Sequence, residues 1–288
     1  MNAQEVNQLY LNSMLEATES SNKVLWRVRE LWWPHFLEFF GENKTNSINQ
    51  LDIAMGRSRD LLREQAENYA FEKIGNRDSD QYRQRISQFL KSNTGKMFER
   101  FIGLAIAYYL LKEDSEYAIW PFRNDLSNVS NHLNKEHFNI NCQLGNTSYI
   151  TTIDSDLIVF TPEDGEKDFY MLSIKSTLKD RFHNVPFWNL LRVCAVNNIH
   201  GLSAVNQDIL SRAKYVAACT DLAEEQPDFA GHDGPRNLLC VDAAILDGAY
   251  VTCSTARGLG SDENHFGENR AQAFYQLSKF LEMLCETA

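Results

Sequence analysis

The sequence DLIVFTPEDGEKDFYMLSIKSTLKDR, residues 156–181, contains two short apolar runs that are rich in β-branched and aromatic residues. The runs cover 157–160 and 169–174, and the polar segment between them holds Pro162 and Gly165, which favour chain reversal. This pattern predicts two buried strands joined by a tight turn.

Three polar side chains mark the open end of this expected hairpin. Side chains alternate between the two faces of a strand, so Ser173 and Lys175 share one face while Ile174 takes the other. In a hairpin the start of the first strand lies beside the end of the second, which brings Asp156 close to both. We therefore expect a carboxylate, a hydroxyl and an ammonium group to converge at one edge of a sheet.

Composition indicates a globular chain. Its 288 residues are 43% hydrophobic, enough for one large core or two small domains. No apolar run approaches the ~20 residues of a membrane span, and the polar N-terminus lacks the apolar region of a signal peptide. The six cysteines are scattered without a CxxC pair, which favours reduced thiols in a core over disulfides or zinc. We expect a soluble, cytoplasmic protein.

The net charge of −11 argues against loose, field-driven binding to nucleic acid. It leaves room for a local basic cleft, because exposed charges are screened over roughly 8–10 Å. Two segments are locally basic. The first comprises Arg83, Arg85, Lys91, Lys96 and Arg100, and the second comprises Lys175, Lys179, Arg181 and Arg192.

Residues 1–92 read as helical almost throughout. Pro34 is expected to end or kink one helix, and a further helix is expected over 47–74. The aromatic stretch WWPHFLEFF is more typical of packing between helices than of a platform for stacked bases. We expect a helical N-terminal region, 1–92, and a core, 93–288, within one compact domain.

A strongly apolar helix is expected to begin at Thr94, as its N-cap, and to end near residue 111. Its wide apolar stripe would pack against a sheet. Glu99 lies in the first turns of this expected helix. It is either a first-turn acid favoured by the helix dipole or a carboxylate that points toward the sheet edge at Asp156, and the sequence leaves both open.

The remaining segments predict an α/β fold, with helices around a mixed sheet. We expect strands at 117–122, 213–219, 237–241 and 249–253, and a C-terminal helix over 269–285. A helix beginning near Pro186 is expected to carry Phe187, Leu190, Leu191, Cys194 and Ala195 on one side. Residues 125–146 are expected to be loop with weak helix, with His132 and His137 on the surface, and FAGHDGPRN (229–237) is either a DNA-facing loop or a simple turn.

Asp156, Glu99, Ser173 and Lys175 together suit metal-assisted phosphate chemistry. Carboxylate oxygens are the ligands that Mg²⁺ prefers, and Mg²⁺ keeps several waters and favours phosphate substrates. A nearby lysine can orient or help to deprotonate a water for in-line attack on a phosphodiester, while the metal stabilises the developing charge.

The triplet Lys179, Asp180 and Arg181 follows directly. It is either a solvated helix start or a set that reads bases, because basic side chains donate to guanine O6 and N7 and an aspartate accepts from cytosine N4. An acid suits cytosine and is poorly placed beside phosphates, so Asp180 favours base readout.

The segment SIKSTLKDR, with Asp156 upstream and TGKMFE (94–99) further upstream, resembles the PD-(D/E)xK type II restriction endonucleases that cut sites containing CCGG or CCNGG. BsaWI, AgeI and EcoRII belong to that group. The resemblance covers residues 95–181 and implies a restriction-endonuclease-like mixed β-sheet core flanked by helices, with a bound Mg²⁺.

The resemblance also implies roles for single residues. Asp156 and Lys175 would be catalytic, Ser173 would replace the usual second acid, and Glu99 would supply the missing carboxylate, so that Asp156 and Glu99 hold the metal. The basic-acidic-basic triplet at 179–181 would read the C:G pairs.

The chain departs from the pattern of these enzymes at three positions. Lys179 stands where many of them have arginine, so the two parallel hydrogen bonds that a guanidinium donates are lost at this position. Some relatives place a glutamate in the next helix, where this chain offers only Asn189. Asp154 lies on the same strand face as Asp156 and is a rival for the metal, although Asp156 is preferred because it directly precedes the apolar run.

The sequence thus predicts a type II restriction endonuclease that uses Mg²⁺ to cut double-stranded DNA at a palindromic site containing CCGG or CCNGG, leaving 5′-phosphates. A palindrome mirrors a two-fold symmetric protein, so we expect a homodimer, with a tetramer left open. The region 1–92 would mediate dimerisation, DNA contact or both, and a cognate DNA methyltransferase is expected in the same host. Two alternatives stay open: a PD-(D/E)xK nuclease of repair or mobile-element DNA, and a non-enzymatic helical interaction protein.

Overall fold

The computed structural model describes residues 1–42, 44–175, 182, 184–220, 237–254, 256, 258–260, 265–267 and 270–286. The α-helices are α1 (Ala3–Leu15), α2 (Lys23–Arg27), α3 (Trp33–Glu42), α4 (Lys44–Asn49), α5 (Leu51–Arg57), α6 (Arg59–Ile74), α7 (Asp80–Lys112), α8 (Asn184–Val196), α9 (Gln207–Arg212), α10 (Asn237–Ile245) and α11 (Leu277–Glu286). The strands are β1 (Ala118–Pro121), β2 (Asn139–Leu144), β3 (Thr147–Thr152), β4 (Leu157–Phe160), β5 (Phe169–Lys175), β6 (Leu202–Ala204), β7 (Ala213–Cys219), β8 (Gly248–Val251) and β9 (Tyr275–Gln276). Among these described helices, none is both long and apolar enough to cross a membrane.

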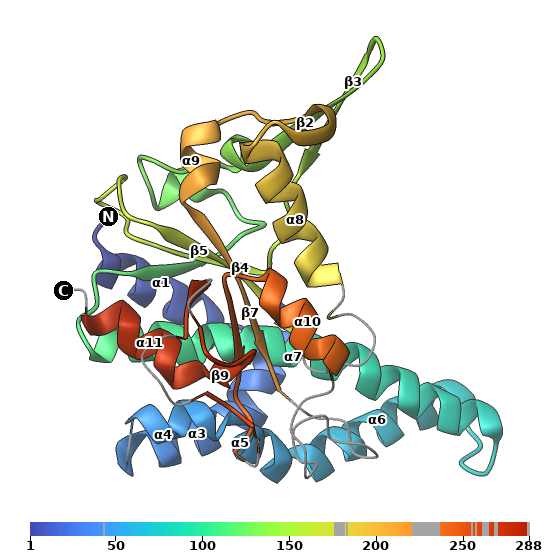
Figure 1. Ribbon diagram of the computed structural model, residues 1–288. Helices are drawn as coiled ribbons and strands as arrows, with labels where there is room; N and C mark the ends of the chain where they lie inside the picture. The colour runs from blue at the N-terminus through green and yellow to red at the C-terminus, as the bar shows by residue number, and fades with distance from the viewer. Residues whose placement is uncertain are drawn as a thin grey trace.

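A mixed sheet lies at the centre of the fold, with the strand order β1-β4-β5-β7-β8-β9 (Figure 1). The strands β1, β4 and β5 pair antiparallel, whereas β5, β7, β8 and β9 pair parallel. The helices α7, α10 and α11 contact its strands. The predicted α/β class, a mixed sheet flanked by helices with a helical N-terminal portion, is confirmed.

The hairpin predicted around residues 156–175 is present. Leu157 faces Leu172 and Val159 faces Tyr170 across β4 and β5, and both strands are buried nearly throughout, as continuous apolar runs require. Lys175, at the end of β5, pairs with Cys219 at the end of β7. The site residues therefore lie where the parallel strands of the sheet end.

A second sheet has the order β3-β2-β6, and its middle strand lies in the segment 125–146, for which the sequence predicts loop with weak helix. That prediction is wrong for residues 139–144, which form β2, although short 3₁₀ turns do cover Leu126–Asn128 and Lys135–Phe138. Polar side chains link the strands: Ser148 Oγ donates to Asn141 Oδ1, and Thr152 Oγ1 donates to Asn139 Oδ1, both at 2.6 Å. Strands held by polar pairs lack the apolar alternation that a sequence pattern detects.

The N-terminal region is helical, as predicted, but its helices are divided differently. Pro34 does not end its helix. It lies in the first turn of α3, directly after a π-helical turn (Val28–Trp32), where its missing N–H is tolerated. The single helix predicted over 47–74 is divided among α4, α5 and α6, with breaks at Gln50 and at Ser58, whose hydroxyl donates to the Leu31 carbonyl. As predicted, it ends before Gly75, which adopts a left-handed conformation.

The aromatic stretch at 32–40 packs between helices. The rings of Trp32 and Phe36 lie 5.5 Å and 6.0 Å from the ring of Phe101 on α7, and all three side chains are buried. The core interpretation of this stretch is confirmed.

Helix α7 begins earlier than predicted. Its N-cap is Ser79, whose hydroxyl accepts a hydrogen bond from the Tyr82 N–H, so the N-cap predicted at Thr94 is wrong. Thr94 and Gly95 lie inside the helix, because packing outweighs the roughly 1 kcal/mol that an interior glycine costs relative to alanine. The helix runs through position 92, and one hydrophobic core cluster contains residues from both sides of it.

Two predictions for the C-terminal half are wrong in element type or extent. Residues 237–241 belong to α10 rather than to a strand, because a short apolar run does not distinguish a strand from a helix. The C-terminal helix starts at Leu277, since Tyr275–Gln276 forms the edge strand β9. The strands predicted at 213–219 and 249–253 are present as β7 and β8.

The predicted apolar side of α8 is only partly buried: Ala195 is buried, but the two largest side chains at its start are not. Phe187 and Leu190 are 54% and 47% exposed, whereas Asn189 and Arg192 are buried. The reason is a polar network: Arg192 Nη2 donates to Asp247 Oδ2 at 3.0 Å and Arg192 Nε donates to Asn189 Oδ1 at 2.8 Å. This network fixes α8 so that the side with Asn189 and Arg192 faces the protein interior.

Gly103→Ala is expected to destabilise the protein, although alanine is the better helix former. A Cβ at this position would overlap the Tyr10 hydroxyl of α1 and lie 3.3 Å from Leu157 Cδ1, and such overpacking costs about 1–3 kcal/mol. Urea unfolding measures the change. Gly56→Ala, at a helical position with open space around it, should stabilise slightly, and adding Tyr10→Phe should recover part of the Gly103→Ala loss. An unchanged unfolding free energy for Gly103→Ala would contradict this packing.

Candidate active site

The carboxylate of Asp156, directly before β4, is the point at which the predicted polar groups meet. Its Oδ2 accepts hydrogen bonds from the Ile174 backbone N–H at 2.7 Å, from Lys175 Nζ at 3.0 Å and from Ser173 Oγ at 3.4 Å. The side chains of Asp156 and Lys175 remain 14% and 23% exposed. The predicted convergence of carboxylate, hydroxyl and ammonium is therefore present, at an edge that solvent reaches.

Backbone contacts hold Asp156 in place beside the last residues of β5. Its N–H donates to the Leu172 carbonyl at 3.2 Å, and its own carbonyl accepts from the Phe122 N–H at 3.2 Å. The buried Ser155 hydroxyl is within hydrogen-bond distance of the carbonyls of Leu157, at 2.9 Å, and Leu172, at 3.1 Å. The carboxylate is consequently presented by a rigid element rather than by a loose loop.

Glu99 approaches this edge from the middle of α7. Burial raises the pKa of its carboxyl, Arg100 opposes that rise, and the negative charge of Asp156 raises the pKa further. Its Oε1 lies 3.5 Å from Arg100 Nη1. Because α7 begins at Asp80, Glu99 is not a first-turn acid, and that interpretation is wrong. The interpretation that remains is a carboxylate near Asp156.

Asp154, the rival of Asp156, points to a different partner. Its carboxylate lies 3.6 Å from Arg123 Nη2 and is half exposed, while its backbone carbonyl accepts a hydrogen bond from the Tyr215 hydroxyl. The bonds to Ser173 and Lys175 belong to Asp156. Asp154 is thus placed beside the site rather than at its centre.

Arg123 and Tyr215 are two neighbours of the site that the sequence does not predict. Arg123 lowers the pKa of Glu99 from a turn after β1, and Tyr215 reaches the Asp154 carbonyl from β7. Their positions depend on the pairing of strands that are far apart in the sequence, for which no local pattern exists. The sequence places Arg100, which also lowers the pKa of Glu99, only in a basic segment.

Other candidate residues lie elsewhere or outside the described residues. Lys179, Asp180 and Arg181 lie outside them, and so does the loop at 229–236. The amide of Asn189 donates to the Ile245 carbonyl of α10 at 2.7 Å, and its Oδ1 accepts from Arg192 Nε.

The described residues suit a metal that keeps much of its water. They contain no group of three or more His, Cys, Asp or Glu side chains arranged to hold a metal. Asp156 and Glu99 offer two carboxylates, which is the usual protein share for Mg²⁺ bound through waters and substrate phosphates. The Asp156 charge that raises the pKa of Glu99 is a repulsion that a divalent cation would relieve. These residues therefore fit Mg²⁺.

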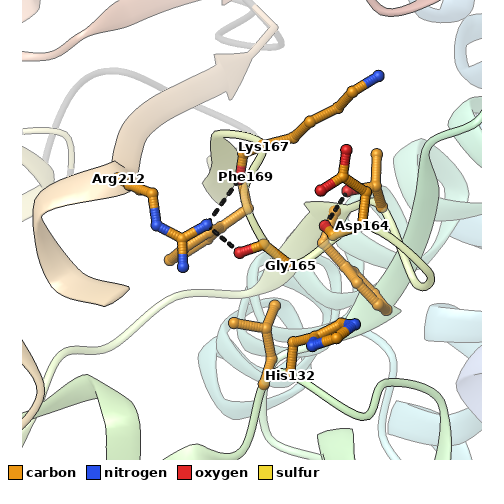
Figure 2. A pocket seen from close by; sticks show the side chains of 9 residues that line it. His132, Asp164, Gly165, Lys167, Phe169 and Arg212 are labelled. Carbon is orange, nitrogen blue, oxygen red and sulfur yellow. Dashed lines mark hydrogen bonds between the residues drawn. The ribbon is translucent and has the colours of Figure 1, made fainter. Parts of the chain in front are cut away.

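A small pocket at the far end of the β4–β5 hairpin has a structural explanation (Figure 2). It is lined by residues that include His132, Gly165 and Arg212, and its volume of about 10 Å³ is at most that of one water molecule. Arg212 donates to the carbonyls of Gly165 and Lys167 and so ties the turn to α9. The exposed His132 donates from Nε2 to the Glu163 carbonyl, 3.1 Å away. The pocket anchors the turn and is too small for a ligand.

Comparisons with known proteins give a similarity in structure but none in sequence. No protein-family model matches the chain, and no curated protein matches its sequence. Among solved structures, the chain is similar to that described as "Restriction endonuclease PspGI-substrate DNA complex", with a TM-score of 0.42 and 12% identity. The similarity covers 99% of this chain and 92% of that one. A similarity of this degree does not place the chain in a family.

Proposed function

We propose that this protein is a Mg²⁺-dependent type II restriction endonuclease that cuts double-stranded DNA at a palindromic site containing CCGG or CCNGG and leaves 5′-phosphates. The observation that carries the proposal is the meeting of Ser173 Oγ and Lys175 Nζ on one oxygen of Asp156, at the open end of two buried strands. A carboxylate with a lysine beside it, on a rigid sheet edge, is the arrangement that metal-assisted hydrolysis of a phosphodiester needs.

In this proposal each residue has its own role. Lys175 orients the attacking water, and its positive charge favours loss of the water's proton to solvent, while Asp156 holds the lysine at 3.0 Å in the free protein. Ser173, where the family pattern has an acid, donates its hydroxyl hydrogen to the Asp156 carboxylate and can accept a hydrogen bond from a water. Asp156 and Glu99 would hold Mg²⁺, which when bound supplies charge stabilisation to the phosphate.

Sequence recognition is assigned to the triplet that follows β5. In this proposal Lys179 and Arg181 donate to guanine and Asp180 accepts from cytosine. A palindromic site implies a homodimer, and a restriction enzyme implies a methyltransferase in the same host that protects the site. Asp180→Ala is expected to relax discrimination by about 1–3 kcal/mol per misread pair, as measured by cleavage of matched oligonucleotides. Unchanged specificity would assign Asp180 to a helix start.

The experiment that tests the nuclease is incubation of supercoiled plasmid with the purified protein in Mg²⁺ and, separately, in EDTA. Discrete linear fragments in Mg²⁺ alone support the proposal, and Asp156→Asn should abolish them. A smear would support a nuclease without sequence specificity, of the repair or mobile-element kind. Intact plasmid in Mg²⁺ and Mn²⁺ would overturn the proposal in favour of an interaction protein.

Glu99→Gln is expected to have opposite effects on metal binding and on stability. Loss of the Glu99 carboxylate should weaken Mg²⁺ binding at least about tenfold, because removing even a group that only hydrogen-bonds to a metal ligand has an effect of this size. Because the folded-state pKa is raised, the folded protein binds more protons than the unfolded chain between the ordinary and the raised value. The free energy of unfolding without metal therefore falls as the pH rises through this range.

Glutamine removes the titration, so Glu99→Gln should be more stable than the unaltered protein at neutral pH without Mg²⁺. Calorimetric titration with Mg²⁺ and urea unfolding in EDTA between about pH 4 and 8 measure the two effects. Glu163→Gln, on the exposed β4–β5 turn, is the control. If Glu99→Gln and Glu163→Gln bind Mg²⁺ equally well, Glu99 is not a ligand.

A further inference from the structure

The first half of α7 differs in charge from the rest of the protein. From residue 81 to residue 98 it contains four basic residues and no acid, in a chain whose net charge is −11. Figure 1 shows this half of α7 projecting from the sheet together with α6. The exposed side of α6 carries acids, at Asp60, Glu64 and Glu72. Beyond Asp80, the first residue of α7, this half of the helix is therefore basic.

One row of side chains on α7 is polar along its whole length. We call it the α7 stripe: it consists of Gln81, Arg85, Gln88, Ser92 and Lys96. Successive members are three or four residues apart, so they are neighbours on one side of the helix, and all five are exposed. The next residue in the row is Glu99, of the candidate active site. The α7 stripe and the candidate active site are therefore adjacent on the same side of α7.

The chemistry of the α7 stripe matches phosphate. Arginine, lysine, glutamine and serine are side chains that donate to phosphate oxygens in protein–DNA complexes. Neither Arg85 nor Lys96 forms an ion pair with any residue that the structure describes. Arg83, on another side of the helix, lies 3.8 Å from Asp80. The donors of the stripe are therefore available to a partner.

We propose that the α7 stripe binds the phosphate backbone of duplex DNA on the flank of the cleavage site. This rests on the proposed nuclease function and extends it to the helical N-terminal region. At 1.5 Å per residue, Arg85 lies about 21 Å along the helix from Glu99, the length of about six base pairs. The stripe holds DNA by its backbone and reads no bases, so its contribution is independent of sequence.

The test compares two double variants on the same helix. Arg85→Gln/Lys96→Gln removes the two charges of the stripe, and Arg83→Gln/Lys91→Gln removes two exposed charges from its other sides, with the same change in net charge. Both are made in full-length protein that also carries Lys175→Ala, so that DNA is not cut. Fluorescence anisotropy with a 30-base-pair duplex of mixed sequence, at several NaCl concentrations, gives the affinity and its salt dependence.

Arg85→Gln/Lys96→Gln is expected to weaken binding at least tenfold at low salt and to reduce the slope of log K against log salt by about 0.9 for each phosphate that the protein no longer neutralises. Arg83→Gln/Lys91→Gln should change affinity less than threefold. Equal losses of DNA affinity in the two variants would overturn the proposal, since only net charge would then matter. Absence of DNA binding by the Lys175→Ala parent would also overturn it. If the expected difference appears but the Lys175-containing protein cuts no plasmid, the DNA-binding stripe stands and the nuclease function fails.

Discussion

Lys175→Ala is expected to lower the rate of DNA cleavage by about 10²–10⁴-fold while leaving DNA binding nearly intact, because a positioned proton-transfer group contributes a factor of this size. The reason lies in the contacts of the Asp156 carboxylate. The Ile174 N–H and the Ser173 hydroxyl still donate to it after the lysine is gone, so the carboxylate stays in place without a group to orient the water.

Lys214→Ala provides a matched control for this change. Lys214 also lies in a strand of the central sheet beside a carboxylate, with Nζ 3.7 Å from Asp168 Oδ2, but it is at the opposite end of the parallel strands. Single-turnover cleavage and anisotropy, measured on both variants, separate rate from affinity. Cleavage by Lys175→Ala at the rate of Lys214→Ala would remove Lys175 from the mechanism.

Asp247→Ala is expected to destabilise the protein by about 3–5 kcal/mol, the effect of removing one partner from a buried ion pair. Asp247 Oδ2 accepts from Arg192 Nη2 at 3.0 Å and from the Tyr215 backbone N–H at 2.6 Å. Arg192 is only 7% exposed, and burial lowers the pKa of its guanidinium. Without Asp247, a buried cation and a buried N–H both lose their partner.

Urea unfolding measures this loss, and two further variants interpret it. Asp168→Ala removes a half-exposed carboxylate and should cost less than about 1 kcal/mol. Arg192→Met/Asp247→Asn removes the buried charge and keeps an acceptor for the Tyr215 N–H, so it should cost less than Asp247→Ala alone. A loss below about 1 kcal/mol for Asp247→Ala would show that this network does not hold α8 to the sheet.

The sequence predicted the centre of the fold because its signals there are local. Residues 157–160 and 169–175 are continuous apolar runs around a turn, so their pairing and the meeting of Asp156 with Lys175 follow from strand geometry alone. The strand at 213–219 was found for the same reason. These are the positions where local propensity and tertiary packing agree.

The predictions that are wrong concern elements whose orientation or ends depend on contacts between residues far apart in the sequence. The inward face of α8 is set by Arg192 and its partner Asp247, which are far apart in the chain, and a pattern of apolar residues pointed to the opposite side. Thr94 has the chemistry of an N-cap, but α7 continues through it because both neighbouring turns are packed. For Glu99 the sequence left two interpretations, and the true start of α7 removed one of them.

The most direct test of the proposed function is sequencing of the DNA ends that the protein produces from a plasmid of known sequence in Mg²⁺. We predict ends that carry 5′-phosphates and fall within sites that contain CCGG or CCNGG, with no ends in EDTA. Ends distributed without regard to sequence, or an uncut plasmid, would contradict it.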